Sequence, residues 1–196
     1  MNCAVLDNLR AAFAGLALAA CLCASAAELE ICYDYGCYRQ ARVVFADVDL
    51  AALRALLEPA VDAAAERSLL AQAVGRMYAL AALQSPIWRD RARNSMDERH
   101  LDGAMDCIDH STNTDRFLRL LESAGALRFH TVGPRSHRFA FLIFAEHWTA
   151  TLVATQGAER FAVDSWFFEP GEPALVVTLE RWQAGYDPES DLKAAR

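Results

Sequence analysis

Three residues in the second half of this chain have the types and the order that nucleophilic catalysis requires: Cys107, His147 and Asp164. A cysteine thiolate is a strong nucleophile, and a histidine can take up its proton and return it to a leaving group. A carboxylate next to that histidine fixes the tautomer and orientation of the imidazole. The three residues therefore predict a Cys-His-Asp triad for acyl transfer, provided that the fold brings them together.

Cys107 stands where a helix is expected to begin. Apolar residues follow it at helical spacing and Gly125 is a suitable stop, so we expect a helix over about residues 107–124. The positive end of the helix dipole would stabilise a thiolate there, and the backbone N–H of Cys107 could donate to an oxyanion. The negative charges of Asp106 and Asp109 would destabilise a thiolate at Cys107. We therefore interpret the two as structural residues that cap the helix or hold a neighbouring loop.

His147 and Asp164 are expected on adjacent strands. Residues 147–153 and 158–166 have strand patterns and are separated by four residues, Ala154-Thr155-Gln156-Gly157. A hairpin with that loop pairs Val153 with Ala158, and it places His147 directly opposite Asp164 on a shared face. A slip of one residue would separate the two. The opposite face then carries a core set: Trp148, Ala150, Leu152, Phe161 and Val163.

This arrangement resembles the transglutaminase-like branch of the papain-like cysteine peptidases. Asp106-Cys107-Ile108-Asp109 is similar to the Asp-Cys-x-Asp motif of bacterial transglutaminase-like cysteine proteinases, and Val163-Asp164-Ser165-Trp166 is similar to their segment around the acidic residue. The run MDCIDHSTNT also resembles a group of exported proteobacterial proteins. The resemblance covers roughly residues 103–184. It implies a papain/transglutaminase-like fold, with the nucleophile helix packed on an antiparallel β-sheet, and peptidase, amidase or transglutaminase-like activity.

The same resemblance gives roles to further residues and leaves one role open. Trp148 and Trp166 would shield the site. Met105 stands where the bacterial motif usually has glycine, and His110 stands where an aromatic residue commonly follows. No glutamine lies just upstream of Cys107 to serve as the side-chain donor of a papain-type oxyanion hole, so the second donor is unassigned.

Two other functions fit the same residues. Cys107 and His110, together with His147 or Asp164, could form a zinc site with an open fourth position. A non-catalytic periplasmic binding module on a degenerate transglutaminase-like fold is the other. His110 is also an alternative base, because it lies one helical turn after Cys107. The remaining polar residues of this region are expected at the surface: His130, His137, Arg135 and Arg138, the arginines in a loop over residues 133–138.

The N-terminal segment predicts export. Residues 11–27 are uncharged and mostly apolar, too short for a typical spanning helix and suited to a signal peptide over residues 1–26. Leu18-Ala19-Ala20-Cys21 also resembles a lipobox, which would make Cys21 a lipidation site. We therefore expect a periplasmic or secreted protein, either soluble or anchored by a lipid. After cleavage the remaining cysteines are Cys32, Cys37 and Cys107, and we expect a Cys32–Cys37 disulfide within a hairpin.

Length, composition and charge limit the classes of protein. The chain has 196 residues, of which 54% are hydrophobic, and a net charge of −7. These values indicate a single folded domain over residues 28–196 and argue against a nucleic-acid partner. The expected substrate is a protein, a peptide or a cell-wall amide, with no cofactor and no metal. Membrane contact is expected only through the signal or a lipid anchor, and the protein is expected to be a monomer.

The remaining elements are expected to support the site. A hairpin over residues 29–33 and 38–47 and two helices over 49–57 and 59–83 make up an N-terminal part, residues 29–85. Residues 86–104 are polar and predict a surface loop. Further strands are expected at 127–132, 138–145 and 174–178, and a short helix at 179–184. Helices followed by a run of strands predict an α+β fold.

Overall fold

The computed structural model of the chain describes residues 26–140 and 145–189. The predicted signal peptide and Cys21 lie outside the described residues. In chain order the strands and α-helices are β1 (Ala27–Tyr33), β2 (Arg39–Phe45), α1 (Asp47–Leu57), α2 (Ala63–Ala82), α3 (Cys107–Ser123), β3 (His130–Ala140), β4 (Ala145–Ala154), β5 (Arg160–Asp164), β6 (Leu175–Thr178) and α4 (Leu179–Gln183). Two 3₁₀ helices, η1 (Pro86–Arg89) and η2 (Met96–Glu98), lie between α2 and α3.

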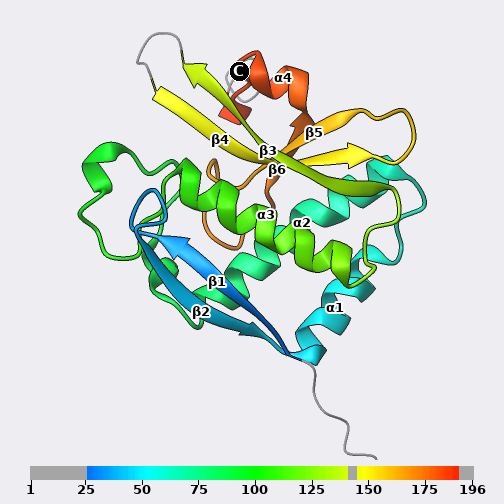
Figure 1. Cartoon of the computed structure of the whole chain (residues 1–196), viewed down its shortest axis with the longest axis horizontal. Coiled ribbons are helices and arrows are strands. Elements are labelled where there is room, and N and C mark those ends of the chain that lie inside the picture. The colour runs from blue at the N-terminus through cyan, green and yellow to red at the C-terminus, as the bar shows by residue number, and fades with distance from the viewer. Residues whose placement is uncertain (1–25, 141–144, 190–196) are drawn as a thin grey trace, which may run out of the picture.

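The predicted α+β class is confirmed. β1 and β2 form an antiparallel hairpin, and β3 to β6 form an antiparallel sheet in the order β3-β4-β5-β6. α2 and α3 cover one face of the larger sheet and α4 covers the other, while the β1–β2 hairpin lies on the far side of α3 (Figure 1). None of the helices in the two described ranges has the length and apolar character needed to cross a membrane.

The main core lies between the larger sheet and the helices beneath it. As the sequence predicts, Ala150, Leu152, Phe161 and Val163 share the buried face. They belong to the same apolar cluster as Phe117 of α3. The aromatic ring of Phe117 also meets the rings of two residues from the N-terminal part, Phe45 and Tyr78, edge to face. α3 is thus the central helix of the fold, and its N-terminus carries Cys107.

Three expectations for the secondary-structure elements were wrong. α2 begins at Ala63 instead of residue 59, because the Asp62 side chain accepts the backbone N–H of Ala65 and caps the helix there. The predicted strands over 127–132 and 138–145 are a single strand, β3, which continues through a β-bulge at Pro134 and Arg135. The segment 86–104 is more than a surface loop, because Ile87, Asp90 and Asn94 are buried.

His130 was also wrongly expected at the surface. It is 1% exposed, at the start of β3, and its Nδ1 lies 2.9 Å from Oε1 of the buried Glu66. Its Nε2 lies 3.2 Å from an Arg67 guanidinium nitrogen, which can only donate, so Nε2 accepts and Nδ1 carries the proton. Glu66 also accepts the backbone N–H groups of Arg128 and Phe129. One buried carboxylate therefore fixes the start of the sheet on α2.

Replacement of that carboxylate tests its role in stability. We expect Glu66→Ala to lower the free energy of unfolding by about 3 kcal/mol, since it leaves several buried donors without an acceptor. Urea unfolding at pH 7 measures the change. Glu180→Ala removes an exposed carboxylate from α4 and serves as the control, with little expected change. Equal stability of the two variants would contradict the role given to Glu66.

Candidate active site

His147 and Asp164 meet on the face of the sheet that α4 covers. His147 Nε2 lies 2.7 Å from Asp164 Oδ2. The predicted register was nevertheless wrong: Val153 pairs with Arg160, two residues beyond the predicted Ala158. The hairpin loop is Thr155–Ala158, because Ala154 N–H bonds to the Glu159 carbonyl. A shift of two residues preserves the face of every side chain, so His147 and Asp164 still share one face.

His147 lies near the start of β4, beyond the residues that pair with β5, so its side chain can reach Asp164 diagonally. β4 pairs with β5 only over Ala150–Val153, whereas residue 147 pairs with Arg138 of β3. The gap beside His147 is filled by aromatic rings from the segment after β5. Trp166 lies 4.8 Å and Phe167 5.6 Å from the imidazole, measured between ring centroids. Trp166 therefore packs against the histidine, as expected. The Trp148 ring, which was expected to do the same, instead contacts His137 and Arg135.

Trp182 of α4 completes this group, and the sequence analysis missed it. Its indole N–H donates to Asp164 Oδ2 at 2.8 Å, and its ring stacks on His147 at 5.5 Å between centroids. The backbone N–H of Trp166 donates to the other oxygen, Oδ1. A tryptophan in a short C-terminal helix gives no sequence signal of its target, because α4 could not be placed on either face of the sheet beforehand.

These contacts keep Asp164 ionised although it is buried. Burial acts to raise its pKa, but the charge and hydrogen bond of His147 and the Trp182 hydrogen bond outweigh burial and hold the pKa below its usual value. An ionised carboxylate can only accept hydrogen bonds, so Nε2 of His147 carries a proton. The other ring nitrogen, Nδ1, makes no hydrogen bond to any residue that the structure describes.

Cys107 is the first residue of α3 and lies against the backbone of β4 at His147. The Asp106 carboxylate caps α3 by accepting the N–H groups of Ile108 and Asp109. The Cys107 thiol donates to the carbonyl oxygen of Glu146, with Sγ 3.5 Å away, and the N–H of Trp148 donates to the sulfur. The thiol thus contacts the residues on both sides of His147. Within the described residues there is no hydrogen bond between the thiol and the imidazole.

The thiol is protonated in this resting arrangement, contrary to the expected helix-stabilised thiolate. Burial raises the pKa of Cys107 to about 11, and the charges of Asp106 and Asp164 add to the effect. The N–H groups of Trp148 and of Cys107 itself lower it by less. Nucleophilic chemistry at Cys107 therefore requires a base that removes the proton. The strand whose backbone the thiol contacts, β4, carries His147, and Nδ1 of that histidine is unbonded among the described residues.

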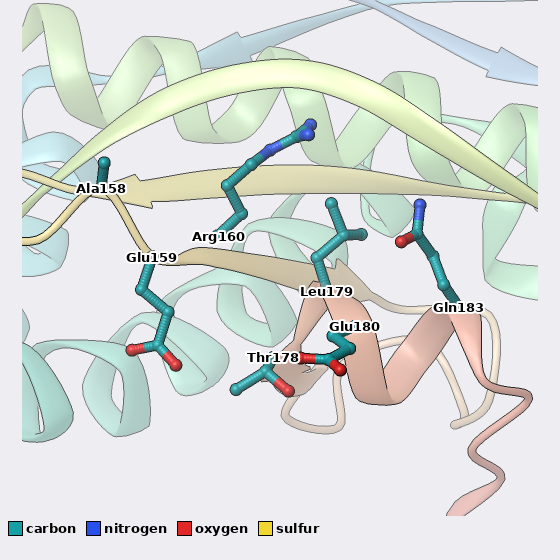
Figure 2. A pocket seen from close by; sticks show the side chains of 7 residues that line it. All are labelled: Ala158, Glu159, Arg160, Thr178, Leu179, Glu180 and Gln183. Carbon is teal, nitrogen blue, oxygen red and sulfur yellow. The ribbon is translucent and has the colours of Figure 1, made fainter.

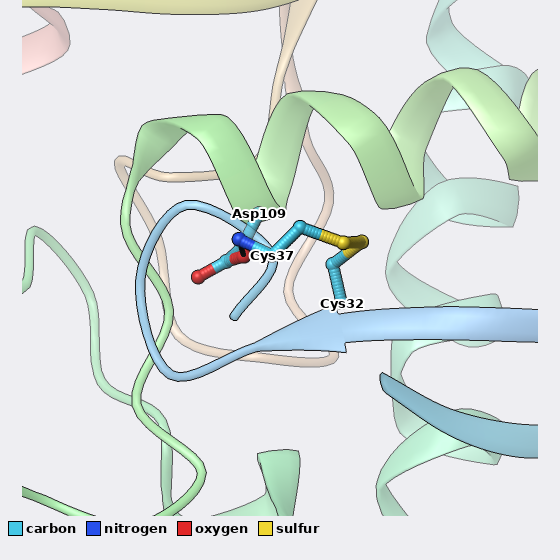
Figure 3. A group of neighbouring side chains, drawn as sticks. All are labelled: Cys32, Cys37 and Asp109. Atoms are coloured by element: carbon cyan, nitrogen blue, oxygen red, sulfur yellow. Dashed lines mark hydrogen bonds between the residues drawn. A yellow bond between two sulfur atoms is a disulfide. The ribbon is translucent and has the colours of Figure 1, made fainter. Parts of the chain in front are cut away.

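Asp106 and Asp109 hold a neighbouring loop, as interpreted from the sequence. The predicted Cys32–Cys37 disulfide is confirmed and closes this loop against the start of α3 (Figure 3). Asp106 accepts the N–H of Gly36 at 3.0 Å, and Asp109 accepts the N–H of Cys37 at 2.5 Å. The possible ligand atoms of Cys32, Cys37 and Asp109 lie within 4.8 Å of one another, but both sulfurs are oxidised and unsuited to bind a metal.

His110 points away from Cys107 into a buried polar network. It is 2% exposed, its Nε2 lies 3.0 Å from Asp90 Oδ2, and its Nδ1 lies 2.9 Å from Ser165 Oγ. Burial acts to lower its pKa, but the charge and hydrogen bond of Asp90, together with the charges of Asp164 and Asp109, outweigh burial and the pKa is raised. Both ring nitrogens are engaged, so the structure gives no zinc site with Cys107 and no second base at the thiol. Sequence reasoning missed Asp90 because it lies in a polar segment without periodicity.

His137 is exposed, as expected, and lies 4.8 Å from Trp148 between ring centroids. Arg135 and Arg138 were wrongly expected to be solvated. Arg138 is half-buried and donates to the carbonyls of Trp182 and Tyr186, and Arg135 stands over the ring of Trp148. A separate pocket lies at the opposite end of β5 from Asp164 and holds none of the predicted site residues (Figure 2).

Comparison with known proteins adds no assignment: no family, no curated protein and no solved structure matches the chain.

Asp109 gives the site a pH-dependent stability that can be measured. Burial and the charge of Asp106 raise its pKa to about 7. The folded protein therefore binds this proton more tightly than the unfolded chain does. Between the ordinary carboxyl pKa of about 4 and pH 7, the free energy of unfolding of the wild type should fall relative to that of Asp109→Asn.

Urea unfolding of both proteins at several pH values from 4 to 8 measures that difference. Asp97→Asn, which alters an exposed acid in η2, is the matched control and should show no such trend. A difference that is constant with pH would exclude a raised pKa at Asp109.

Proposed function

We propose that this protein is an exported, cysteine-dependent acyl-transfer enzyme with Cys107 as nucleophile, His147 as general base and acid, and Asp164 as the residue that orients the imidazole. The observation that carries the proposal is the buried Asp164–His147 hydrogen bond of 2.7 Å beside a thiol that contacts both neighbours of His147. An oriented imidazole within reach of a cysteine is the arrangement that activates a thiol, and the contacts of Cys107 with residues 146 and 148 bring the thiol to the strand that carries His147.

The reaction follows from the protonation states. Asp164 holds the proton on Nε2, which leaves Nδ1 of His147 to take the thiol proton as sulfur attacks an amide or ester carbonyl. The S–C bond forms and the carbonyl electrons move onto oxygen. When the intermediate collapses, the C–N or C–O bond breaks and His147 returns the proton to the leaving group. Water then releases the acid, or an amine gives transamidation.

The surroundings of Cys107 stabilise the charges that develop in this reaction. The ionised Asp164 lies 2.7 Å from the imidazole that receives the thiol proton, and the stacked Trp182 and neighbouring Trp166 keep water from the pair. The N–H groups of Cys107 and Trp148 face the sulfur, so they lie near the carbonyl oxygen of an acyl group that bonds to it. Trp148 thereby offers the second donor that the sequence left unassigned.

The finer fold assignment belongs to this proposal. A helix that begins at the cysteine and packs on an antiparallel sheet bearing the histidine and the aspartate supports a transglutaminase-like fold. The Cys32–Cys37 disulfide supports an oxidising compartment, the periplasm or the exterior. A protein, a peptide or a cell-wall amide is the proposed substrate.

A non-catalytic binding module on the same fold is the second candidate. The raised pKa of Cys107 and the lack of a thiol–imidazole hydrogen bond among the described residues favour it. In such a module, the His147–Asp164–Trp182 group would only anchor α4 to the sheet. The two candidates differ in whether His147 changes the reactivity of the thiol.

Alkylation of Cys107 by iodoacetamide as a function of pH separates them. For an enzyme we expect a component of the wild-type rate below pH 8 that His147→Ala loses, which lowers the rate at pH 7 by at least about tenfold. The variant then retains a single rise near the pKa of about 11 that its surroundings impose. Asp164→Asn should weaken the same component.

His137→Ala is the matched control, since it removes an exposed imidazole that contacts Trp148 from the neighbouring strand. Its profile should equal that of the wild type. If wild type, His147→Ala and His137→Ala all show one rise at high pH, the protein is a binding module. Intact protein mass confirms that Cys107 alone is modified while the Cys32–Cys37 pair stays oxidised.

A further inference from the structure

Arg135 reaches the Cys107 side of the sheet because of the bulge in β3. Gly133 pairs with Thr151 and Ser136 with Thr149, so Pro134 and Arg135 together stand opposite Ala150. The extra residue turns the side chain of Arg135 to the face that α3 covers. There its guanidinium carbon lies 5.2 Å from the centroid of the Trp148 ring. A bulge next to a reactive residue commonly serves to aim a side chain.

α3 holds one edge of the guanidinium. Nη1 of Arg135 donates to Ser111 Oγ at 3.1 Å and to Thr112 Oγ1 at 2.7 Å. Both hydroxyls give their own protons to the carbonyl of Ile108, so they present only lone pairs to the arginine. The cation is therefore fixed in direction by α3 and by the Trp148 ring, while its other N–H groups are unbonded among the described residues.

Arg135 has no carboxylate partner in the described part of the chain. Arg39, Arg42, Arg89, Arg93 and Arg119 pair with acids, whereas Arg135, like Arg128 and Arg138, donates to neutral oxygens. The acids near the start of α3 have other partners. Asp106 and Asp109 hold the disulfide loop, and Asp164 holds His147. A half-buried guanidinium with an open edge is thus held by residues of α3 about one helical turn beyond Cys107.

The placement of Arg135 relative to Cys107 follows from α3 and β4. Ser111 lies four residues after Cys107, which is about 6 Å along a helix. Trp148 links the two groups from the other side, since its N–H faces the sulfur and its ring lies under the guanidinium. The thiol and the guanidinium are therefore both held between the first two turns of α3 and residue 148 of β4.

From this geometry we infer that Arg135 binds a carboxylate of the substrate, so that the acyl group transferred by Cys107 carries a free carboxylate a few bonds from the reacting carbonyl. A planar guanidinium binds a carboxylate through two parallel hydrogen bonds, and an aromatic ring beneath it keeps that edge in place. The inference rests on the proposed function for its substrate, but the anion site itself exists whether or not the protein catalyses a reaction.

A pair of alkylating reagents tests the site without a known substrate. N-iodoacetyl-β-alanine carries a carboxylate a few bonds from its reactive carbon, and its amide is the neutral counterpart. In both reactions the Cys107 thiolate displaces iodide, so an S–C bond forms and a C–I bond breaks. The ratio of the two rates at one pH cancels the fraction of thiolate, and therefore does not depend on His147.

We expect wild-type protein at low salt to react about tenfold faster with the carboxylate reagent, as for a hydrogen bond to a charged group. Arg135→Gln should reverse this preference, because the acids around Cys107 then repel the anion, while Arg135→Lys should keep part of it. Arg160→Gln makes the same change of charge at the exposed end of β5 (Figure 2) and should leave the ratio unchanged.

Two outcomes would overturn the inference. One is a wild-type ratio of one or less, which needs no variant and so does not depend on the folding of Arg135→Gln. The other is an equal ratio in wild type, Arg135→Gln and Arg160→Gln, which would show non-specific attraction of anions. A clear carboxylate preference with no effect of His147 on the pH profile would retain the anion site and reject the enzyme.

Discussion

The buried contact between His110 and Asp90 joins the three segments from which the candidate site is built. His110 lies in the first turn of α3, Asp90 lies in the segment between η1 and η2, and Ser165, bonded to the same imidazole, directly follows Asp164. Asp90 also accepts the N–H of Met105, two residues before Cys107. The positions of Cys107 and of Asp164 are thus set by one network that neither of them belongs to.

Nearly every member of this network is buried, so all of its hydrogen bonds must be made within the protein. Ser165 Oγ also meets the hydroxyls of Thr114 and Tyr78, and Tyr78 donates to the carbonyl of His110. Buried polar groups stabilise a fold only when their hydrogen bonds are made. Only one arrangement of α2, α3 and the end of β5 allows all these hydrogen bonds. This explains how the start of α3 and the end of β5 keep their relative positions without a covalent link.

Much of the fold and the main part of the candidate site could be predicted from the sequence, for identifiable physical reasons. Periodicity located α3 and the strands, and alternation predicted that His147 and Asp164 share a face. That prediction survived a register that was wrong by two residues, because side chains alternate with a period of two. The environment of Cys107 was beyond sequence reasoning, since its raised pKa comes from burial and from Asp106 and Asp164 in three dimensions.

What sequence patterns could not provide was the set of partners from irregular segments. Asp90, Trp182 and Glu66 act through contacts with residues far away in the chain, and none stands in a motif. Arg135 was missed for another reason: a proline normally indicates the end of a strand, whereas here Pro134 lies in a β-bulge and strand pairing continues beyond it. Each miss lies where tertiary contacts override a local preference.

The loop closed by the Cys32–Cys37 disulfide makes this part of the fold depend on the redox conditions around the protein. Asp34, Tyr35, Gly36 and Cys37 all have positive φ, a left-handed turn that is costly for residues with a side chain, at about 1–2 kcal/mol each. The N–H groups that this turn presents are the ones that Asp106 and Asp109 accept. While the two sulfurs are reduced, no covalent bond holds the turn against its own strain. The backbone donors that Asp106 and Asp109 accept at the start of α3 are thereby held in place by the oxidation of two other cysteines.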